Sequence, residues 1–405
     1  MMLDARRPRI LFVAEAVTLA HVGRMLALAE TLDRSRYEPL VACDPRYRMA
    51  IGTPSVPLHD IHTIPSEQFF NALDGGKPIY RKQDLITYVE EDLKLIESFR
   101  PDVVVGDFRL SLAASARLAK VPYISLTNAY WSPFADIRYV VPDIPPTRIL
   151  GVRMAQKLFD LVRPLAFAQH AAPINGMLRH FNQPRLPADL RHAYTNADFT
   201  LYSDIAELVP TRQLPSHHQF IGPVQWAPNV AAPAWWERIP TDKPVVYVNL
   251  GSSGHGKLLP EVMSALSNLP MTVVGATAGR VKLERLAGNE FVADFLPGDQ
   301  AVERASLVIC NGGSPTCYQA LAAGKPIIGM PVNLDQYLNM SLVENAGAGV
   351  SLRSGKHSIA NLVEATTRII ETGRQGEQAR RLSGLIRQYD PAQAFGTLLT
   401  RLTGG

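Results

Sequence analysis

The stretch Val308–Asn339, with the sequence VICNGGSPTCYQALAAGKPIIGMPVNLDQYLN, constrains the fold of this chain more than any other. The apolar run 306–310 is typical of a buried parallel strand. Gly312 and Gly313 follow at its carboxyl end, and Ser314 is a favourable N-cap for the helix that comes next. Glycines let the backbone approach an anion closely, and a helix N-terminus presents unpaired amides. The pattern therefore predicts an anion site.

A polar cluster follows the second predicted strand of this stretch, 326–330. The cluster consists of Asp335, Gln336 and Asn339, at the start of the next predicted helix. Because parallel strands end at the same edge of a sheet, we expect the cluster and the anion site at one edge. Carboxylate and amide groups there suit a polyhydroxyl group better than a nucleobase or a lipid.

The same stretch resembles the donor-binding signature of the nucleotide-sugar glycosyltransferases with the GT-B fold, the group of UDP-glycosyltransferases and macrolide glycosyltransferases. The family pattern runs His-Gly-Gly-Ser-Gly-Thr-x-x-Glu-Ala-Leu, then Gly-x-Pro, then Asp-Gln-x-x-Asn. Three positions depart from it: Asn311 replaces a His, Pro315 a Gly and Gln319 a Glu. The matching positions are Gly312, Gly313, Ser314, Thr316, Ala320, Leu321, Gly324, Pro326, Asp335, Gln336 and Asn339.

This resemblance implies an α/β protein of two Rossmann-like doubly wound domains that face a cleft. It also implies an inverting, metal-independent transfer of a sugar from a UDP- or dTDP-sugar to a hydroxyl of a small-molecule or lipid acceptor. The nucleotide sugar is then a co-substrate, and no cofactor or metal is expected. The chain has no Asp-x-Asp pair, which weighs against a metal-dependent glycosyltransferase of the other major fold. The expected donor-binding residues are Gly251, Ser252, Ser253, Phe295, Leu296, Asn311, Gly312, Gly313, Ser314, Thr316, Gln319, Asp335 and Gln336.

Composition supports a folded enzyme and excludes other classes. A chain of 405 residues exceeds what one core usually holds, so two domains are expected. The net charge of +4, from 41 basic and 37 acidic residues, is too balanced to indicate nucleic-acid binding. Cys43, Cys310 and Cys317 lack metal-ligand spacing and are predicted to be buried thiols of a reducing compartment. We expect a cytoplasmic protein, because the sequence has neither a signal-peptide pattern nor a membrane-spanning run.

The order of predicted elements gives the domain boundaries. Strands and helices alternate through the first half, which is the rhythm of a parallel α/β sheet. We expect an acceptor-binding domain over 1–222, a linker rich in proline and alanine over 223–244, and a donor-binding domain over 245–388. The resemblance implies that a helix in 389–405 crosses back to the first domain.

His21 and Asp107 are the predicted catalytic residues. His21 follows the first predicted strand and opens a helix, where a neutral imidazole able to accept a proton is expected. Asp107 closes another predicted strand, from which a carboxylate can orient the imidazole. The alternative is that both residues only cap helices. The resemblance favours catalysis: His21 matches the family's base, although Ala20 replaces the usual Gly before it, and 101–107 matches Pro-Asp-x-Val-Val-x-Asp.

Two features in the second half of the predicted first domain carry open interpretations. Tyr130, Trp131 and Phe134 follow a strand end and are predicted to line an apolar acceptor pocket, or else to be ordinary core aromatics. Residues 148–165 are predicted to form one basic amphipathic helix. Such a helix fits peripheral contact with a membrane surface, although a solvated face is the commoner meaning of the pattern.

The glycine-rich loop Gly251–Lys257 has most of the phosphate-binding loop motif of nucleoside triphosphatases. Leu258 stands where that motif requires a magnesium-binding Ser or Thr, so a kinase or ATPase is a minor alternative. The resemblance instead assigns the loop amides and Ser252 or Ser253 to the donor diphosphate. Phe295 matches the family aromatic that stacks on the nucleobase, with a core position as its alternative.

Two other functions fit the same architecture. A nucleotide-sugar 2-epimerase binds the donor without an acceptor, but it needs further carboxylates that the sequence does not place. A catalytically degenerate homologue that activates a partner enzyme is favoured by Asn311, whereas the retained His21 and Asp107 argue against it.

Overall fold

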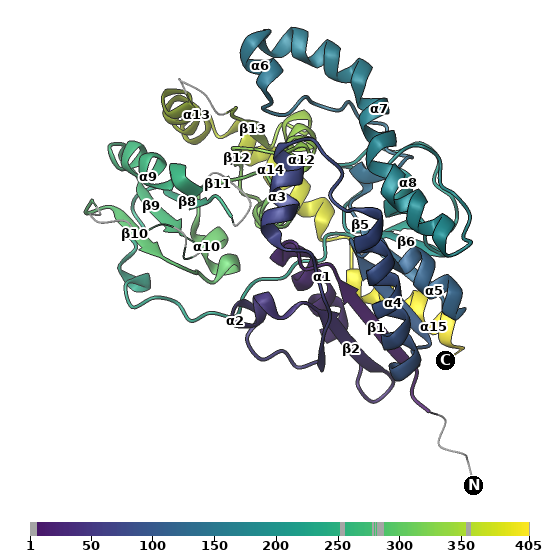
Figure 1. Cartoon of the computed structure of the whole chain (residues 1–405). Helices are drawn as coiled ribbons and strands as arrows, with labels where there is room; N and C mark the ends of the chain where they lie inside the picture. The colour runs from purple at the N-terminus through teal and green to yellow at the C-terminus, as the bar shows by residue number, and fades with distance from the viewer. Residues whose placement is uncertain are drawn as a thin grey trace. The chain divides into compact units, whose positions relative to one another are not determined.

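The computed structural model describes residues 6–404 except 252–255, 278, 280, 282–286 and 354–357, and only the backbone of Ser358. The chain forms two compact units, whose secondary structure is labelled in Figure 1. Unit 1 comprises Met1–Ile137, Asp160–Trp226 and Tyr389–Gly405, and unit 2 comprises Arg138–Phe159 and Ala227–Gln388.

Unit 1 is built on a seven-stranded sheet in the order β3-β2-β1-β4-β5-β6-β7, with every neighbouring pair parallel. The strands are β1 (Arg9–Ala14), β2 (Glu38–Cys43), β3 (Leu58–Asp60), β4 (Val103–Asp107), β5 (Tyr123–Thr127), β6 (Phe199–Tyr202) and β7 (His218–Phe220). The central strands are apolar runs buried along their whole length, as expected for a parallel sheet covered on both faces.

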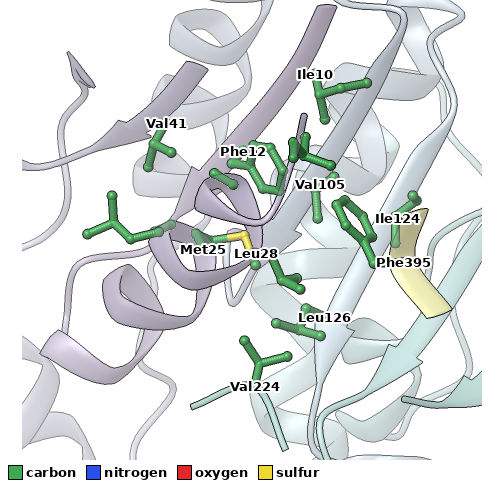
Figure 2. Packing of buried hydrophobic residues seen from close by; sticks show 14 of the residues in the cluster. Ile10, Phe12, Met25, Leu28, Val41, Val105, Ile124, Leu126, Val224 and Phe395 are labelled. Carbon is green, nitrogen blue, oxygen red and sulfur yellow. The ribbon is translucent and has the colours of Figure 1, made fainter. Parts of the chain in front are cut away.

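Helices connect these strands and close the core of unit 1. They are α1 (Leu19–Glu30), η1 (Pro45–Tyr47), α2 (Arg48–Ile51), α3 (Ser66–Asp74), α4 (Lys82–Phe99), α5 (Leu112–Ala119), η2 (Ala129–Trp131), α8 (Arg191–Tyr194) and α15 (Pro391–Thr403). Figure 2 shows side chains of β1, β4 and β5 packed with those of α1 and α15. The rings of Phe12 and Phe395 lie 5.7 Å apart there, so α15 completes the core of unit 1.

Unit 2 contains a six-stranded parallel sheet in the order β10-β9-β8-β11-β12-β13. The strands are β8 (Val245–Asn249), β9 (Thr272–Ala276), β10 (Glu290–Ala293), β11 (Leu307–Cys310), β12 (Ile327–Gly329) and β13 (Gly349–Ser351). Its helices are α6 (Pro145–Ile149), η3 (Trp236–Arg238), η4 (Gly256–Leu258), α9 (Leu259–Ser267), α10 (Gly298–Arg304), α11 (Ser314–Ala322), α12 (Leu334–Asn345), α13 (Ser358–Thr372) and α14 (Arg374–Ile386). The prediction of two parallel α/β domains is therefore confirmed.

Both sheets reverse their strand order next to the first strand of the unit, between β1 and β4 in unit 1 and between β8 and β11 in unit 2. Ligands of open α/β sheets bind beyond the carboxyl ends of the strands at such a reversal. The paired end residues are Ala14 with Asp107 in unit 1 and Asn249 with Cys310 in unit 2. The predicted catalytic and donor-binding residues follow these strand ends.

The domain boundaries differ from the prediction in two places. Residues 138–159 group with unit 2, although the sequence analysis assigned them to the first domain. The expected linker is not a free connection, because from residue 227 onward it belongs to unit 2. Trp236 is buried there, and Arg304 of α10 donates to its carbonyl oxygen at 2.8 Å.

Two helix assignments also need correction. The helix predicted over 148–165 is interrupted, because Gly151 has a φ of +73° and separates α6 from α7 (Gly151–His180). Helix α7 then continues through Pro164 and Pro173 and ends 15 residues beyond the predicted limit of 165. Ser314 is the first residue of α11 and not its N-cap, which is Gly313. No helix in the described part of the chain is long and apolar enough to cross a membrane.

Candidate active site and donor site

His21 lies in the first turn of α1, after the loop that follows β1. Its Nδ1 is 2.8 Å from Oδ1 of Asp107, and its side chain is 18% exposed. Because an ionised carboxylate can only accept hydrogen bonds, the proton of this contact is on Nδ1, and Nε2 is the ring nitrogen that does not face Asp107. The structure thus brings the two predicted catalytic residues together in unit 1.

Arg24, one helical turn after His21, is a third member of this group that the sequence analysis missed. Its Nε donates to Oδ2 of Asp107 at 2.7 Å and its Nη2 to Oδ1 at 2.9 Å, which makes a bidentate ion pair. Burial opposes ionisation of Asp107, but the charge of Arg24 and the hydrogen bonds from Arg24 and His21 outweigh it and lower the pKa of that carboxyl. Asp107 is therefore ionised while it holds His21.

The remaining donor of Arg24 is held by residues from other strands. Its Nη1 donates to Oδ1 of Asn128 at 2.9 Å, and Nδ2 of Asn128 donates to Oδ1 of Asp204 at 3.1 Å. The amide of Ala129 donates to Oδ2 of Asp204 at 2.6 Å. Asp107 and Asn128 thus hold the guanidinium of Arg24 on two sides, which fixes its orientation toward Asp107.

A second buried network fixes the backbone around Asp107. Arg109 is fully buried and donates to Glu15 and to Asp92, at 3.1 Å in each case. Burial raises the pKa of both carboxyls, even though Arg109 opposes that change. The amide of Glu15 also donates to the carbonyl oxygen of Asp107 at 3.0 Å. The ends of β1 and β4 are therefore held together by backbone and side chains alike.

Phe108 connects His21 with an apolar cavity. Its φ of +60° is unusual for a bulky residue and turns its ring onto the imidazole, with ring centroids 4.9 Å apart and planes 7° from parallel. Its ring also stacks on that of Tyr194 at 5.7 Å. A small cavity in unit 1 is lined by residues that include Tyr80, Phe108, Leu110, Ile174, Leu190 and Tyr194. Phe108 is therefore shared between the cavity lining and the ring contact of His21, which was not foreseen from the sequence.

The three predicted acceptor residues have different environments. Tyr130 is fully buried in η2, which favours the core interpretation over a pocket-lining role. Trp131 is partly buried, and its ring lies 5.3 Å from that of Tyr194 at the cavity. Phe134, also partly buried, packs edge-on against His218 at 5.2 Å. Trp131 thus contacts a residue that lines the cavity.

The glycine turn of unit 2 is shaped by close packing. Gly312 has a φ of +80°, and a Cβ there would lie 2.5 Å from Cγ of Met340. Nδ2 of Asn339 donates to the carbonyl oxygen of Gly312 at 2.9 Å, while Oδ1 of Asn311 accepts from the amide of Gly313 at 3.0 Å. The side chains of Asn339 and Asn311 thus position the turn. The first amides of α11, which have no partner within the helix, follow directly after it.

The polar residues of the signature divide into positioning and exposed groups. Gln336 is only 2% exposed, and its Oε1 accepts from the amide of Val332 at 2.9 Å. Asp335, in the same first turn of α12, is partly exposed. Gln319 donates to Oδ1 of Asp299 at 3.2 Å, a contact that the sequence did not indicate. Gln336 therefore braces its own loop, whereas Asp335 and Gln319 are reachable from solvent.

The other predicted donor residues follow β8 and β10. Gly251 has a φ of +66°, and a Cβ there would lie 2.7 Å from Nδ2 of Asn311, so the ends of β8 and β11 meet closely. Phe295 is 46% exposed, which excludes the core interpretation, and Leu296 is buried. Ser252 and Ser253 lie outside the described residues. Thr316, in the first turn of α11, is partly buried.

The cysteines and the possible metal-binding side chains are considered next. The three cysteines are buried and free, as predicted. Among the residues that the structure describes, no group of three or more His, Cys, Asp or Glu side chains is placed to hold a metal ion. Metal independence stays a prediction.

Comparison with known proteins bears on these two sites. A family model described as "UDP-glucoronosyl and UDP-glucosyl transferase" matches residues 112–393. The chain is 49% identical over 392 residues to a "PGL/p-HBAD biosynthesis glycosyltransferase" of Mycobacterium tuberculosis, covering 97% of this chain and 90% of that protein. It is 50% identical over 381 residues to a "PGL/p-HBAD biosynthesis rhamnosyltransferase" of Mycobacterium bovis, covering 94% and 85%.

A solved structure shows the same fold. The spinosyn rhamnosyltransferase SpnG matches with a TM-score of 0.70 and 20% identity, over 96% of this chain and 99% of that one. SpnG has also been solved in complex with thymidine diphosphate.

Proposed function

The chain belongs to the family of UDP-glucoronosyl and UDP-glucosyl transferases, and on that premise we propose an inverting, metal-independent transfer of a sugar from a nucleotide-diphosphate sugar to an acceptor hydroxyl. Its relatives at about 50% identity are named as glycosyltransferases and rhamnosyltransferases, and the chain is an enzyme of that class. The observation that carries the proposed mechanism is the His21–Asp107 pair at the strand reversal of unit 1.

The proposed base is Nε2 of His21. It takes the proton of the acceptor hydroxyl as the oxygen attacks the anomeric carbon, and the bond from that carbon to the diphosphate breaks. Attack from the side opposite the leaving group inverts the configuration. Asp107 holds the ring in the required tautomer and stabilises the imidazolium that forms. Arg24 acts through Asp107 and is a positioning residue, because it fixes the carboxylate and balances its charge.

The proposed donor site is built from backbone amides. The glycine turn 312–313 and the N-terminal amides of α11 are directed at the position of the diphosphate, where negative charge grows as the sugar leaves. Phe295 is assigned to stacking on the base, because its ring is exposed beside the sheet end. Asp335 and Gln319 are assigned to hydroxyl groups of the sugar and the ribose.

The relatives narrow the substrates to test. Because one of them is named a rhamnosyltransferase, we take a rhamnosyl donor as the first sugar to test. The acceptor is expected to be apolar with a reactive hydroxyl, because the aromatic rings of Phe108 and Tyr194 lie in a stack beside the ring of His21. We place the reaction in the reducing cytoplasm, since the three cysteines are buried and free.

The two alternative functions have less support. A 2-epimerase has no use for a base that deprotonates an acceptor hydroxyl, and no relative described above is named as one. A degenerate activator has no use for an imidazole that is oriented by a buried carboxylate.

The decisive experiment measures nucleotide release from a panel of UDP- and dTDP-sugars, with and without apolar hydroxylated acceptors. We expect acceptor-dependent release and a product whose anomeric configuration, read by NMR, is inverted. Interconversion of two nucleotide sugars without acceptor would establish the epimerase. Binding without turnover of any donor in the panel would establish the degenerate homologue.

A further inference from the structure

Exposed apolar side chains concentrate on one segment of the chain. Eleven large hydrophobic residues are exposed in the described part of the structure, and eight of them lie within 149–165. These eight are Ile149, Leu150, Val152, Met154, Leu158, Leu161, Val162 and Leu165, on the last residues of α6 and the first half of α7. An apolar surface of this density indicates an interaction site.

Helix α7 arranges most of these residues on one face. Met154, Leu158, Leu161 and Leu165 are separated by four, three and four residues, which places them along a single stripe of a helix. Their exposed fractions are 56%, 43%, 78% and 71%. The same stretch of helix buries Ala155 and Phe167 on a different face, so α7 has both a packed side and an uncovered apolar side.

Positive charge flanks the uncovered stripe. Arg148, Arg153 and Lys157 are exposed, and within the described residues no hydrogen bond or ion pair is found for them. A fourth basic residue, Arg163, lies with its guanidinium 5.6 Å from the Phe167 ring centroid. Asp160 is the one acidic residue in the stretch 145–165. The uncovered face is therefore apolar and carries a positive excess.

We infer that this face, the apolar stripe of α7 with its exposed basic residues, rests on the surface of an anionic lipid bilayer. A helix with an apolar face and Lys or Arg beside it lies in the plane of the headgroups, with the apolar side chains at the acyl boundary. The bilayer supplies both complementary chemistries, since its acyl chains take up Leu161 and Leu165 and its anionic headgroups pair with Arg153 and Lys157. A second copy of the same face would instead bring like charges together.

Vesicle binding tests this surface without any use of the sugar-transfer reaction. The whole protein is sedimented with phosphatidylcholine vesicles and with vesicles of phosphatidylcholine and phosphatidylglycerol at three to one. We expect binding to the anionic vesicles and much weaker binding to the neutral ones. Each basic side chain near an anionic surface changes partitioning about fivefold. The double variant Arg153→Glu, Lys157→Glu removes two positive charges and adds two negative ones, so it is expected to bind at least about 25-fold more weakly.

A second variant tests the apolar stripe, and two matched controls test specificity. Leu161→Glu, Leu165→Glu is expected to lose about tenfold or more in binding, because burial of each leucine in the acyl region contributes strongly. Met49→Glu on α2 replaces a fully exposed apolar residue, and Arg381→Glu on α14 reverses an exposed charge. Both controls should bind as the native protein does, and all four variants should keep its thermal unfolding midpoint.

Three results would overturn the inference. The first is equal binding to neutral and anionic vesicles, and the second is equal loss of binding in the controls and the α7 variants. The third is a stable dimer by sedimentation equilibrium that Leu161→Glu, Leu165→Glu dissociates, because a second copy would then be the occupant.

Discussion

The proposed catalytic site of unit 1 and the proposed donor site of unit 2 lie at the same topological position of their sheets. They are built from different chemical groups. In unit 1, the side chains of His21 and Arg24, both on α1, converge on the buried carboxylate of Asp107 at the end of β4. In unit 2, backbone amides and glycines form the site, and neutral side chains such as Asn339 only hold the turn in place. One end can move a proton, and the other can hold an anion.

This difference decides how visible each site is in a sequence. A backbone site needs consecutive residues of fixed conformation, so it leaves a contiguous pattern of glycines and small residues. A charge network needs only that side chains meet in space, so Arg24 and Asp107 stand 83 residues apart in the chain. Mutations at the two ends should therefore separate proton transfer from nucleotide binding.

The largest effect is expected from His21→Ala, which removes the base from unit 1 and leaves the donor turn of unit 2 unchanged. We expect kcat to fall by about 10³-fold, within the range for loss of a general base. Affinity for the nucleotide, measured by calorimetry, should stay at the native value. His180→Ala, on an exposed position of α7, is the control. Near-native turnover of His21→Ala would show that the base lies elsewhere.

Asp107→Asn should lose less activity, about 10²-fold, since His21 remains with poorer orientation. It should also destabilise unit 1, because Arg24 is left buried without its anion, at a cost of about 3–5 kcal/mol. The lowered pKa of Asp107 means that its ion pair stabilises the fold above the unfolded pKa of about 3.9 and is lost as pH falls through the lower folded value.

Urea unfolding at several pH values checks this second prediction. The difference between native protein and Asp107→Asn should be full at pH 7 and shrink as the pH falls below about 4. Asp74→Asn, at an exposed position, should show no such difference. A difference that persists unchanged in acid would mean that the ion pair is not its source.

Gly312→Ala tests the glycine turn of unit 2. A positive φ and a Cβ only 2.5 Å from Met340 should displace the turn. Strain and overpacking of this kind cost about 1–3 kcal/mol each, so nucleotide affinity should fall by about tenfold to hundredfold. Gly384→Ala, where a Cβ meets open space on α14, should bind nucleotide normally. Unchanged affinity in Gly312→Ala would place the diphosphate away from this turn.

Smaller effects are expected where the signature departs from the family. Asn311→His adds a side chain that can carry charge, so both UDP and dTDP should bind about fivefold more tightly. Gln319→Glu should favour UDP through the ribose 2′-hydroxyl, but Asp299 lies 3.2 Å from Gln319 and would repel a new carboxylate. The test therefore combines Gln319→Glu with Asp299→Asn, and Asp299→Asn alone is its control. Calorimetry without any change in affinity or selectivity would contradict the expected register of the signature.

The last prediction is an absence of effect. If fixed amides in unit 2 stabilise the departing diphosphate, transfer needs no divalent cation, and excess EDTA should leave the rate within about twofold of the untreated enzyme. A steep loss that magnesium or manganese restores would replace the backbone mechanism by a metal-dependent one.

The sequence predicted the sheets well and the site in part, for identifiable reasons. Central strands such as β4 and β11 are apolar runs that end at a polar residue or a glycine, so their limits were clear. The limits of helix α7 were misjudged because the amphipathic pattern of 148–165 runs through Gly151, where the structure separates α6 from α7. The burial of Tyr130 gives no signal in a local pattern, because it depends on the whole fold.

The parts of the site that were missed all depend on distant partners. Arg24 shares a helix face with His21, and that spacing was the one local signal that could have revealed it. Glu15, Asp92 and Arg109 come together from three separate elements, and nothing in their neighbourhoods indicates the network. Long-range pairing of charges is the information that a single sequence lacks.

The contact of Phe12 with Phe395 has a consequence for the order of events during synthesis. The two rings pack in one core although 383 residues separate them. A growing chain that leaves the ribosome from its amino end therefore carries the strands of unit 1 with an uncovered apolar face until α15 is made. Unit 2, whose strands all precede α15, can close its own sheet earlier. Unit 2 can therefore fold completely before unit 1 does, because the core of unit 1, which holds His21, also needs α15.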